Sequence, residues 1–200
     1  MLKSIQILLL VGVMVAGVAC GGGDTNKGDD LFAKGNYKAA IEAYSQYLES
    51  NAADVKTLYN RGRAYQELKM SDLAEKDFMA VIQMDEKNVN ARLSLAKLFY
   101  SKSLYNKAVL WAEQAVDINE NNSQAHFLAA RAKHQLGYVD GAMESYSLAL
   151  KINSDFGEAY LYRGALKLHQ GKKASACEDI RKAQALNVKE AEAIKNKYCN

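Results

Sequence analysis

The sequence contains no proline at all. Proline interrupts helices, because it lacks an N–H group and clashes with the preceding turn, so its absence favours an all-helical fold. The chain also lacks a strong excess of either charge: its formal net charge is only +3 at pH 7, with no basic tail or block of like charges. Proteins that bind nucleic acid usually carry a larger basic patch. The composition therefore argues against that class.

The sequence also lacks the motifs of common catalytic and metal sites. It has no Gly-rich phosphate loop after a strand, no nucleophile elbow and no paired-acid motif. The three histidines, His126, His134 and His169, have no ligand spacing. The first two lie about 12 Å apart along a helix, which is too far to share one metal. We therefore expect no enzyme, no metal and no cofactor.

One long apolar run is present, from Ile7 to Ala19. It is too short to span a bilayer comfortably and fits the core of a signal peptide. It ends in small residues followed by Cys20, and residues 21–27 are rich in glycine and polar residues, as in a flexible tether. The segment resembles a bacterial lipoprotein signal, although Gly17 stands where leucine is usual. The resemblance implies that residues 1–19 are removed and that Cys20 is lipidated, so that residues 20–27 form a lipidated tether.

Two alternatives remain for this segment: an ordinary secretory signal with an incidental cysteine, and a cysteine buried in the mature fold. The lipoprotein interpretation predicts a protein anchored in the bacterial cell envelope. Gly21 is not the aspartate that enterobacteria use to retain lipoproteins in the inner membrane. We therefore expect the outer membrane, with the protein facing the periplasm.

The remaining sequence repeats every 34 residues. The 200 residues, 49% hydrophobic and 24% charged, have the balance of an ordinary folded protein. Three columns recur in one phase. The first consists of small residues: Gly28, Gly62, Ala96, Ala130 and Gly164. The second consists of alanines, Ala40, Ala74, Ala108, Ala142 and Ala176, and the third of Asn or Asp, Asn51, Asp85, Asn119, Asn153 and Asn187. Such a period indicates a solenoid of stacked units.

Each unit contains two stretches with helical periodicity joined by a turn, as in 89–102 and 105–118. The small column on the first helix faces the alanine column on the second, so that the two backbones can approach closely. Large residues such as Tyr44 and Phe78 fill the remaining space. The Asn or Asp column ends each second helix, since short polar side chains bond to nearby backbone.

These features resemble the tetratricopeptide repeat (TPR) family. The resemblance implies an all-α, right-handed superhelical solenoid of about five helical hairpins plus a C-terminal capping helix. The array would cover residues 28–188, with repeats in phase at 21–54, 55–88, 89–122, 123–156 and 157–190, and the cap would cover residues 189–200. The proline that usually follows the second helix is replaced by Ala52, Glu86, Glu120, Ser154 and Val188, so the turns there must form without it.

Two pairs of opposite charges support the register. Arg61 and Arg163 precede the glycine column, and only their repeats carry Asp77 and Asp179 at the matching place on the second helix. We expect a structural ion pair within each of these hairpins, because a charge near the core needs a bonded partner.

Two cysteines remain once Cys20 is lipidated. Cys177 on the last hairpin and Cys199 at the end of the cap are nearly equidistant from the turn around Val188. Antiparallel helices joined there would bring them opposite one another, and an exported protein can oxidise them. We predict a Cys177–Cys199 disulfide; the alternative is two separate thiols.

In the TPR family, residues of the first helices line a concave groove. The equivalent positions here form an apolar row, a basic row one turn later and a further row beyond it. The predicted groove residues are Tyr59, Leu93, Phe127 and Leu161; Arg63, Lys97 and Arg131; and Gln66, Tyr100 and His134. Such a groove would suit a partner peptide that is both acidic and apolar. The alternative is that the cations only solvate this face and bridge to carboxylates such as Glu67.

The sequence thus favours a non-catalytic scaffold that binds a protein or peptide partner, in envelope assembly or secretion, with the membrane engaged through the lipid anchor and no small-molecule substrate. An envelope enzyme, or an enzyme cofactor acting on cell-wall material through an unrecognised site, is the main alternative. A cytosolic co-chaperone is opposed by the signal peptide and by the absence of clamp asparagines. A nucleic-acid binder is opposed by the low net charge.

Overall fold

The computed structural model describes residues 25–199, and the predicted signal peptide and Cys20 lie outside these residues. Within the described part the chain is all helical. Its helices are α1 Thr25–Ala33, α2 Tyr37–Ser50, α3 Val55–Glu67, α4 Ser71–Met84, α5 Val89–Ser101, α6 Tyr105–Ile118, α7 Ser123–Gln135, α8 Val139–Ile152, α9 Gly157–His169, α10 Lys173–Ala185 and α11 Lys189–Tyr198. The first helix begins at Thr25, inside the segment expected to be a tether. No helix in this range is long and apolar enough to cross a membrane.

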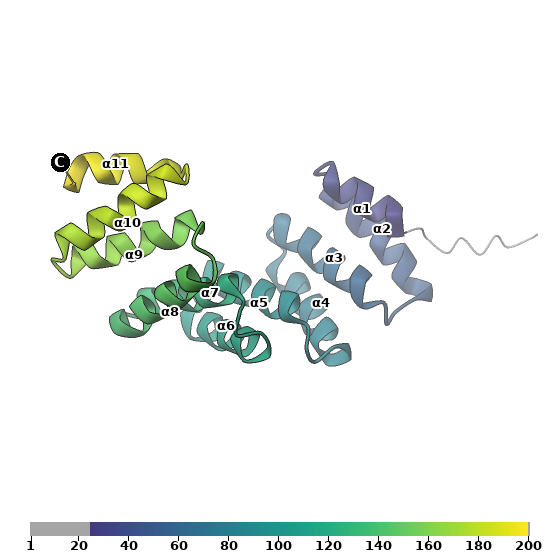
Figure 1. Cartoon of the computed structure of the whole chain (residues 1–200). Helices are drawn as coiled ribbons and strands as arrows, with labels where there is room; N and C mark the ends of the chain where they lie inside the picture. Colours follow the sequence, from purple (N-terminus) through teal and green to yellow (C-terminus); the bar gives the residue numbers. More distant parts are fainter. Residues whose placement is uncertain (1–24, 200) are drawn as a thin grey trace, which may run out of the picture.

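The helices pair into five antiparallel hairpins, α1/α2 to α9/α10, followed by α11 (Figure 1). Each hairpin packs on the next, and the successive first helices α1, α3, α5 and α7 also contact one another. The hairpins stack into a right-handed superhelical solenoid, in which α1 and α2 lie at one end and α9 to α11 at the other. The predicted fold class is confirmed.

Small residues allow the two helices of a hairpin to approach closely. A Cβ atom at Gly62 would lie 2.7 Å from Cε1 of Phe78, and one at Gly164 would lie 3.0 Å from Cγ1 of Ile180. The large partners are wholly buried, as are the facing alanines Ala74 and Ala176. The periodic columns therefore form the core because only a small residue leaves room for the opposing side chain.

Two kinds of turn join the helices. Within the hairpins, Gly35, Gly137 and Gly171 have φ values of +73° to +77°, and Lys69 and Ser103 adopt φ 58° at the equivalent places. Between repeats, the carboxylate of Asp85 and the side-chain amide oxygens of Asn119 and Asn153 accept hydrogen bonds from the backbone N–H two residues on. The Asn or Asp column therefore forms the turns without proline.

Polar caps then start the following helices. The side chains of Asp54, Asn88 and Asn122 accept hydrogen bonds from backbone N–H groups in the first turns of α3, α5 and α7. Such caps satisfy donors that the helix itself leaves free. Both devices are therefore present at the junctions that precede α5 and α7, whereas α9 follows Phe156, which makes no side-chain cap bond.

The last helix covers the end of the array, as expected of a cap. The buried contact comes mainly from Ala191, which packs with Leu161 and Ala183, while Ile194 is half-buried. Ala193 and Tyr198 of the same helix are exposed and line a cleft between α9 and α11.

Candidate binding groove

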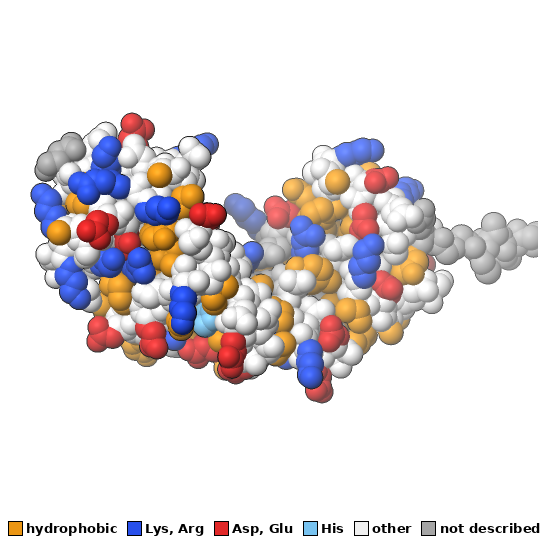
Figure 2. Space-filling model, viewed as in Figure 1, with side chains coloured by type: hydrophobic (Ala, Val, Ile, Leu, Met, Phe, Trp, Pro, Cys, Tyr) orange, Lys and Arg blue, Asp and Glu red, His pale blue; other side chains and the backbone are white. Residues whose placement is uncertain are grey.

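The groove lies on the side of the solenoid formed by the first helices, and in the space-filling view the molecule is hollowed between its two ends (Figure 2). The predicted basic row extends along it. Arg63 and Lys97 are exposed, and Arg131 is half-buried. Among residues 25–199 none of these three cations forms an ion pair. The alternative, in which they bridge to carboxylates such as Glu67, has no contact in the structure to support it.

Aromatic rings take the place of carboxylates beside two of these cations. The guanidinium carbon of Arg63 lies 4.6 Å from the ring centroid of Phe32 and 5.9 Å from that of Tyr59. Arg131 is more enclosed, with its guanidinium carbon 4.4 Å from the ring of Tyr100. Cation–π contacts hold a guanidinium in place without neutralising its charge. The basic row is therefore positioned and still free to bind an anion.

Arg131 lies among three rings in the middle of the groove. Besides Tyr100, the rings of Tyr162 and Phe127 lie 4.8 and 5.8 Å from its guanidinium carbon. Its Nη2 donates a hydrogen bond of 3.2 Å to the hydroxyl of Tyr100, whereas its Nε is buried with no hydrogen-bond partner. An unpaired buried donor on a charged group is costly. Arg131 is therefore a cation of the groove whose charge no described carboxylate neutralises.

A second unpaired polar atom lies close to this cluster. The side chain of Tyr146 is wholly buried, and its hydroxyl has no hydrogen-bond partner. Its ring stacks on that of Tyr162, with centroids 6.4 Å apart. Burial raises the pKa of this hydroxyl strongly, and the charge of Arg131 partly opposes the rise. The hydroxyl therefore stays protonated and available as a donor.

The residues of the predicted apolar row are more buried than the sequence suggested. Leu93, Phe127 and Leu161 are nearly completely buried, and Tyr59 is half-buried. Phe127 packs against Phe156 with ring centroids 4.6 Å apart. These residues form the floor of the groove, because side chains of their own repeat and of the next one pack against them. They expose little apolar surface to a ligand.

The third row is less uniform. Gln66, Tyr100 and His134 are all half-buried, and Tyr100 packs edge-on against Tyr105 with centroids 5.4 Å apart. Burial lowers the pKa of His134, and the charge of His169 on the next repeat lowers it further. His134 is therefore neutral under ordinary conditions and adds no cation to the basic row.

Exposed apolar surface lies instead at the C-terminal end of the groove. A cleft of about 580 Å³ separates α9 from α11, and its lining is Ala165, Leu168, His169, Ala193, Ile194, Lys197 and Tyr198. Ala165 and Leu168 stand one repeat beyond Arg131 and His134 in the same columns. The sequence analysis treated α11 only as a cap and missed this cleft. The change from charged to apolar residues in these two columns was the signal for it.

The predicted ion pairs lie inside their hairpins. Nε and Nη2 of Arg61 each donate to a carboxylate oxygen of Asp77 at 2.8 Å, and Nη1 donates to Ser45 Oγ at 3.1 Å. Bonding to Asp77 raises the pKa of Arg61 above its ordinary value. Arg163 repeats this arrangement with Asp179, again with two bonds of 2.8 Å. Both aspartates are buried, so these pairs hold the hairpins together and lie apart from the groove.

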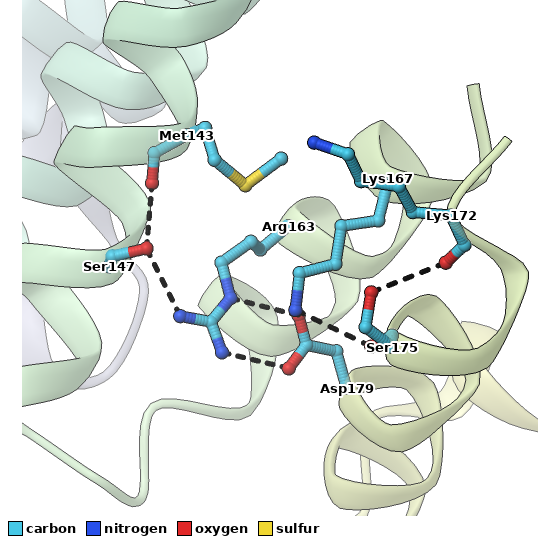
Figure 3. A network of polar contacts seen from close by, with 7 residues as sticks. All are labelled: Met143, Ser147, Arg163, Lys167, Lys172, Ser175 and Asp179. Carbon is cyan, nitrogen blue, oxygen red and sulfur yellow. Dashed lines mark hydrogen bonds and ion pairs between the residues drawn. The ribbon is translucent and has the colours of Figure 1, made fainter. Parts of the chain in front are cut away.

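The second pair belongs to a larger network (Figure 3). Nη1 of Arg163 donates to Ser147 Oγ, which itself donates to the carbonyl of Met143 on α8. Nζ of Lys167 lies 2.7 Å from the carboxylate of Asp179. Asp179 thus holds two cations from α9, and the network ties the fourth hairpin to the fifth.

Cys177 and Cys199 are joined by a disulfide, with Cα atoms 5.5 Å apart. The bond links α10 to the end of α11, which forms one wall of the apolar cleft. It therefore fixes the cap and the shape of that cleft together. His134 and His169 are close enough for the charge of His169 to lower the pKa of His134, but among the described residues no group of three or more His, Cys, Asp or Glu is arranged to hold a metal.

Comparison with known proteins agrees with this architecture. Residues 28–69 match the family described as TPR repeat, and residues 71–149 match the family described as anaphase-promoting complex, cyclosome, subunit 3. Tetratricopeptide repeat protein 6 of Homo sapiens is 25% identical over 156 residues, which are 76% of this chain and 30% of that protein. BBSome complex member BBS4 of Bos taurus is 26% identical over 141 residues, 70% of this chain and 27% of that one. The chain thus spans about a third or less of the length of these curated relatives.

Solved structures show the same fold. A crystal structure of MamA superposes with a TM-score of 0.71 at 24% identity, covering 87% of this chain and 92% of that one. YrrB, whose structure is titled as that of a TPR protein with an unusual peptide-binding site, superposes with a TM-score of 0.68 at 18% identity, covering 86% and 90%. The repeats, the fold and these matches together support a tetratricopeptide repeat protein. Proteins of this class bind protein or peptide partners.

Proposed function

We propose that this chain is a non-catalytic scaffold that binds a partner segment with acidic and apolar side chains in its concave groove. The observation that carries the proposal is the state of Arg131, a half-buried cation held by rings, with an unpaired Nε and no carboxylate partner. A carboxylate of the partner would supply the missing charge and accept its hydrogen bonds. Arg63 and Lys97 continue the positive charge along the groove.

The apolar part of the partner would occupy the cleft between α9 and α11. Leu168, Ile194 and Tyr198 supply its apolar walls. Because the cleft lies one repeat beyond Arg131, a single extended or helical segment can reach both. The partner would therefore carry an acidic side chain followed by an aliphatic or aromatic one.

We further propose that the protein acts at the bacterial cell envelope, anchored through a lipid on Cys20 and facing the periplasm from the outer membrane, in envelope assembly or secretion. The sequence around Cys20 supports this location. The Cys177–Cys199 disulfide supports it independently, because disulfides persist in exported proteins and are rare in the cytosol of most organisms.

The groove is tested by reversing its charge. The triple variant Arg63→Glu/Lys97→Glu/Arg131→Glu should abolish partner capture by crosslinking in cells, while its helical circular dichroism stays nearly unchanged. A matched control, Lys38→Glu/Lys76→Glu/Lys151→Glu, changes three exposed lysines of the second helices by the same charge and should keep capture. Equal capture by both variants would place the binding surface outside the groove.

The anchor is tested separately. Metabolic labelling with a palmitate analogue should mark the parent chain and not the Cys20→Ser variant. Equal labelling of the two chains would reject lipidation at Cys20, without bearing on the groove.

A further inference from the structure

The hairpin turns carry an unusual charge. We define the turn edge as the five equivalent segments that join the two helices of each repeat, together with the first three residues of the second helix, residues 34–39, 68–73, 102–107, 136–141 and 170–175. These segments contain seven lysines and two aspartates, a net charge of +5: Lys34, Lys38, Lys69, Lys102, Lys107, Lys172 and Lys173 against Asp72 and Asp140. The lysines are all exposed.

The opposite side of the solenoid carries the reverse charge. We define the junction edge as the segments between successive repeats and before the cap, together with the first residues of the helix that follows, residues 51–56, 85–90, 119–124, 153–158 and 187–192. These segments contain eight acidic residues and three lysines, a net charge of −5: Asp54, Asp85, Glu86, Glu120, Asp155, Glu158, Glu190 and Glu192 against Lys56, Lys87 and Lys189. The small net charge of the whole chain conceals this separation.

Contacts between repeats show that the members of each edge are neighbours. Lys102 in the third turn forms ion pairs with Asp72 and Glu75 beside the second turn, at 3.0 and 3.8 Å. On the junction edge, the position of a Cβ at Gly157 would lie 2.6 Å from a methyl group of Val188, one repeat later. The charges therefore lie along two opposite edges of the stacked hairpins.

Large apolar side chains project from the turn edge. Met70, Leu104 and Tyr138 occupy the same place in three consecutive repeats, and they remain 43%, 42% and 58% exposed. Leu73, beside Met70, is 40% exposed. Within the junction segments no large hydrophobic residue is as exposed, but Met84, which directly precedes residues 85–90, is 47% exposed. The basic edge is therefore the one that carries exposed apolar side chains at equivalent positions of several repeats.

Local structure accounts for these residues only in part. Met70, Leu104 and Tyr138 precede α4, α6 and α8 at the N-cap position, where none makes a side-chain cap bond and where small polar residues are preferred. A backbone N–H of each bonds back to the preceding helix, as for Met70 to Tyr65, and this type of helix end favours an apolar contact. Such a contact leaves about half of each side chain in water.

We propose that the turn edge docks on an anionic lipid surface. Lysines near such a surface are attracted to its negative charge, and leucine, methionine and tyrosine side chains enter the interfacial region between headgroups and acyl chains. The junction edge is repelled by the same charge and faces away. A solenoid with both features has a defined orientation on the membrane. This inference stands on the two edges alone and does not depend on what the groove binds.

The orientation can be measured by photo-crosslinking with the full chain bound to vesicles. Benzoylphenylalanine replaces Leu104 or Tyr138 on the turn edge, or the exposed Asn121 or Ser154 on the junction edge. The vesicles contain phosphatidylethanolamine with phosphatidylglycerol, or phosphatidylcholine alone. We expect lipid adducts from positions 104 and 138 with the anionic vesicles, background yields from positions 121 and 154, and loss of the difference with phosphatidylcholine.

Charge variants complete the test. The triple variant Lys34→Ala/Lys69→Ala/Lys172→Ala should lower the equilibrium constant for docking of the turn edge on anionic vesicles. The expected decrease is about fivefold per lysine, which corresponds to about 1 kcal/mol each. Glu86→Ala/Glu120→Ala/Glu190→Ala, the matched control on the junction edge, should leave adduct yields at position 104 undiminished. Equal yields from the two edges, or yields at position 104 that do not depend on phosphatidylglycerol, would overturn the proposal. If a short DNA duplex added to the vesicles were crosslinked in place of the lipid, the turn edge would be assigned to nucleic acid instead.

Discussion

The guanidinium carbon of Arg131 lies over the ring of Tyr100, 4.4 Å from its centroid, and the guanidinium also donates a 3.2 Å hydrogen bond to the hydroxyl of that tyrosine. The two residues come from consecutive repeats, α5 and α7, so the contact spans the groove floor between them. It fixes the cation without supplying a counter-charge. The contribution of Arg131 to folding can therefore be measured separately from its contribution to binding.

We predict that Arg131→Met preserves or slightly raises stability while it weakens partner capture. Methionine fills the space between the rings, and the variant removes the buried Nε donor that has no partner, a defect that typically costs about 1 to 3 kcal/mol. Thermal unfolding followed by circular dichroism, together with capture by crosslinking, measures both effects. A large loss of stability in Arg131→Met would show that Arg131 is a structural residue.

The ion pair between Arg61 and Asp77 gives a prediction about stability alone. Asp77→Ala leaves the guanidinium of Arg61 largely buried without its two carboxylate bonds, and removal of one partner of a buried pair typically costs about 3 to 5 kcal/mol. The double variant Arg61→Ala/Asp77→Ala should lose less. Denaturant unfolding of both variants, with Asp72→Ala as a surface control, tests this. Equal losses in the single and double variants would contradict it.

The disulfide should stabilise the cap more than the rest of the array. Cys177 and Cys199 are separated by 22 positions in the sequence, and closing a loop of this size contributes about 3 kcal/mol in the chain-entropy model. Cys199→Ser should lower the melting temperature and raise hydrogen exchange in α11 first. Exchange in α3 and α5 serves as the internal reference. Unchanged protection of α11 would show that packing by Ala191 holds the cap by itself.

His134 should make the protein less stable in mild acid. Its folded-state pKa is lowered by burial and then by His169, so the unfolded chain binds this proton more readily than the folded one. The contribution of His134 is therefore fully present above the unfolded pKa, about 6.5, and is lost as the pH falls below it toward the folded pKa. Denaturation midpoints at pH 7.5 and pH 5 should differ less in His134→Gln than in the parent. In His169→Gln, which removes only the second cause of the lowered pKa, the difference between the two midpoints should lie between those of the parent and of His134→Gln. Identical differences in all three chains would refute the prediction.

The sequence by itself determined the repeat and, through it, the fold. Columns of glycine and alanine, such as those of Gly62 and Ala74, specify how the two helices of a hairpin pack, because only small residues allow the helices to approach around Phe78. Local chemistry also determined the helix starts, since Asp54 and Asn88 cap whatever helix follows them. The partner of Arg61 could be predicted because only the repeats with this arginine carry an aspartate at the place of Asp77. The partner of Cys177 could be predicted because Cys199 is nearly as far from the turn around Val188.

Only the tertiary structure decided how much of each groove residue meets solvent. Leu93 and Arg63 belong to adjacent rows in the sequence, yet one is buried and the other exposed, because exposure depends on the neighbouring repeats and not on helical spacing. The cleft between Leu168 and Ile194 depends in the same way on the angle of α11. Periodicity specifies which residues share a face, and the packing of several helices at once specifies what that face presents.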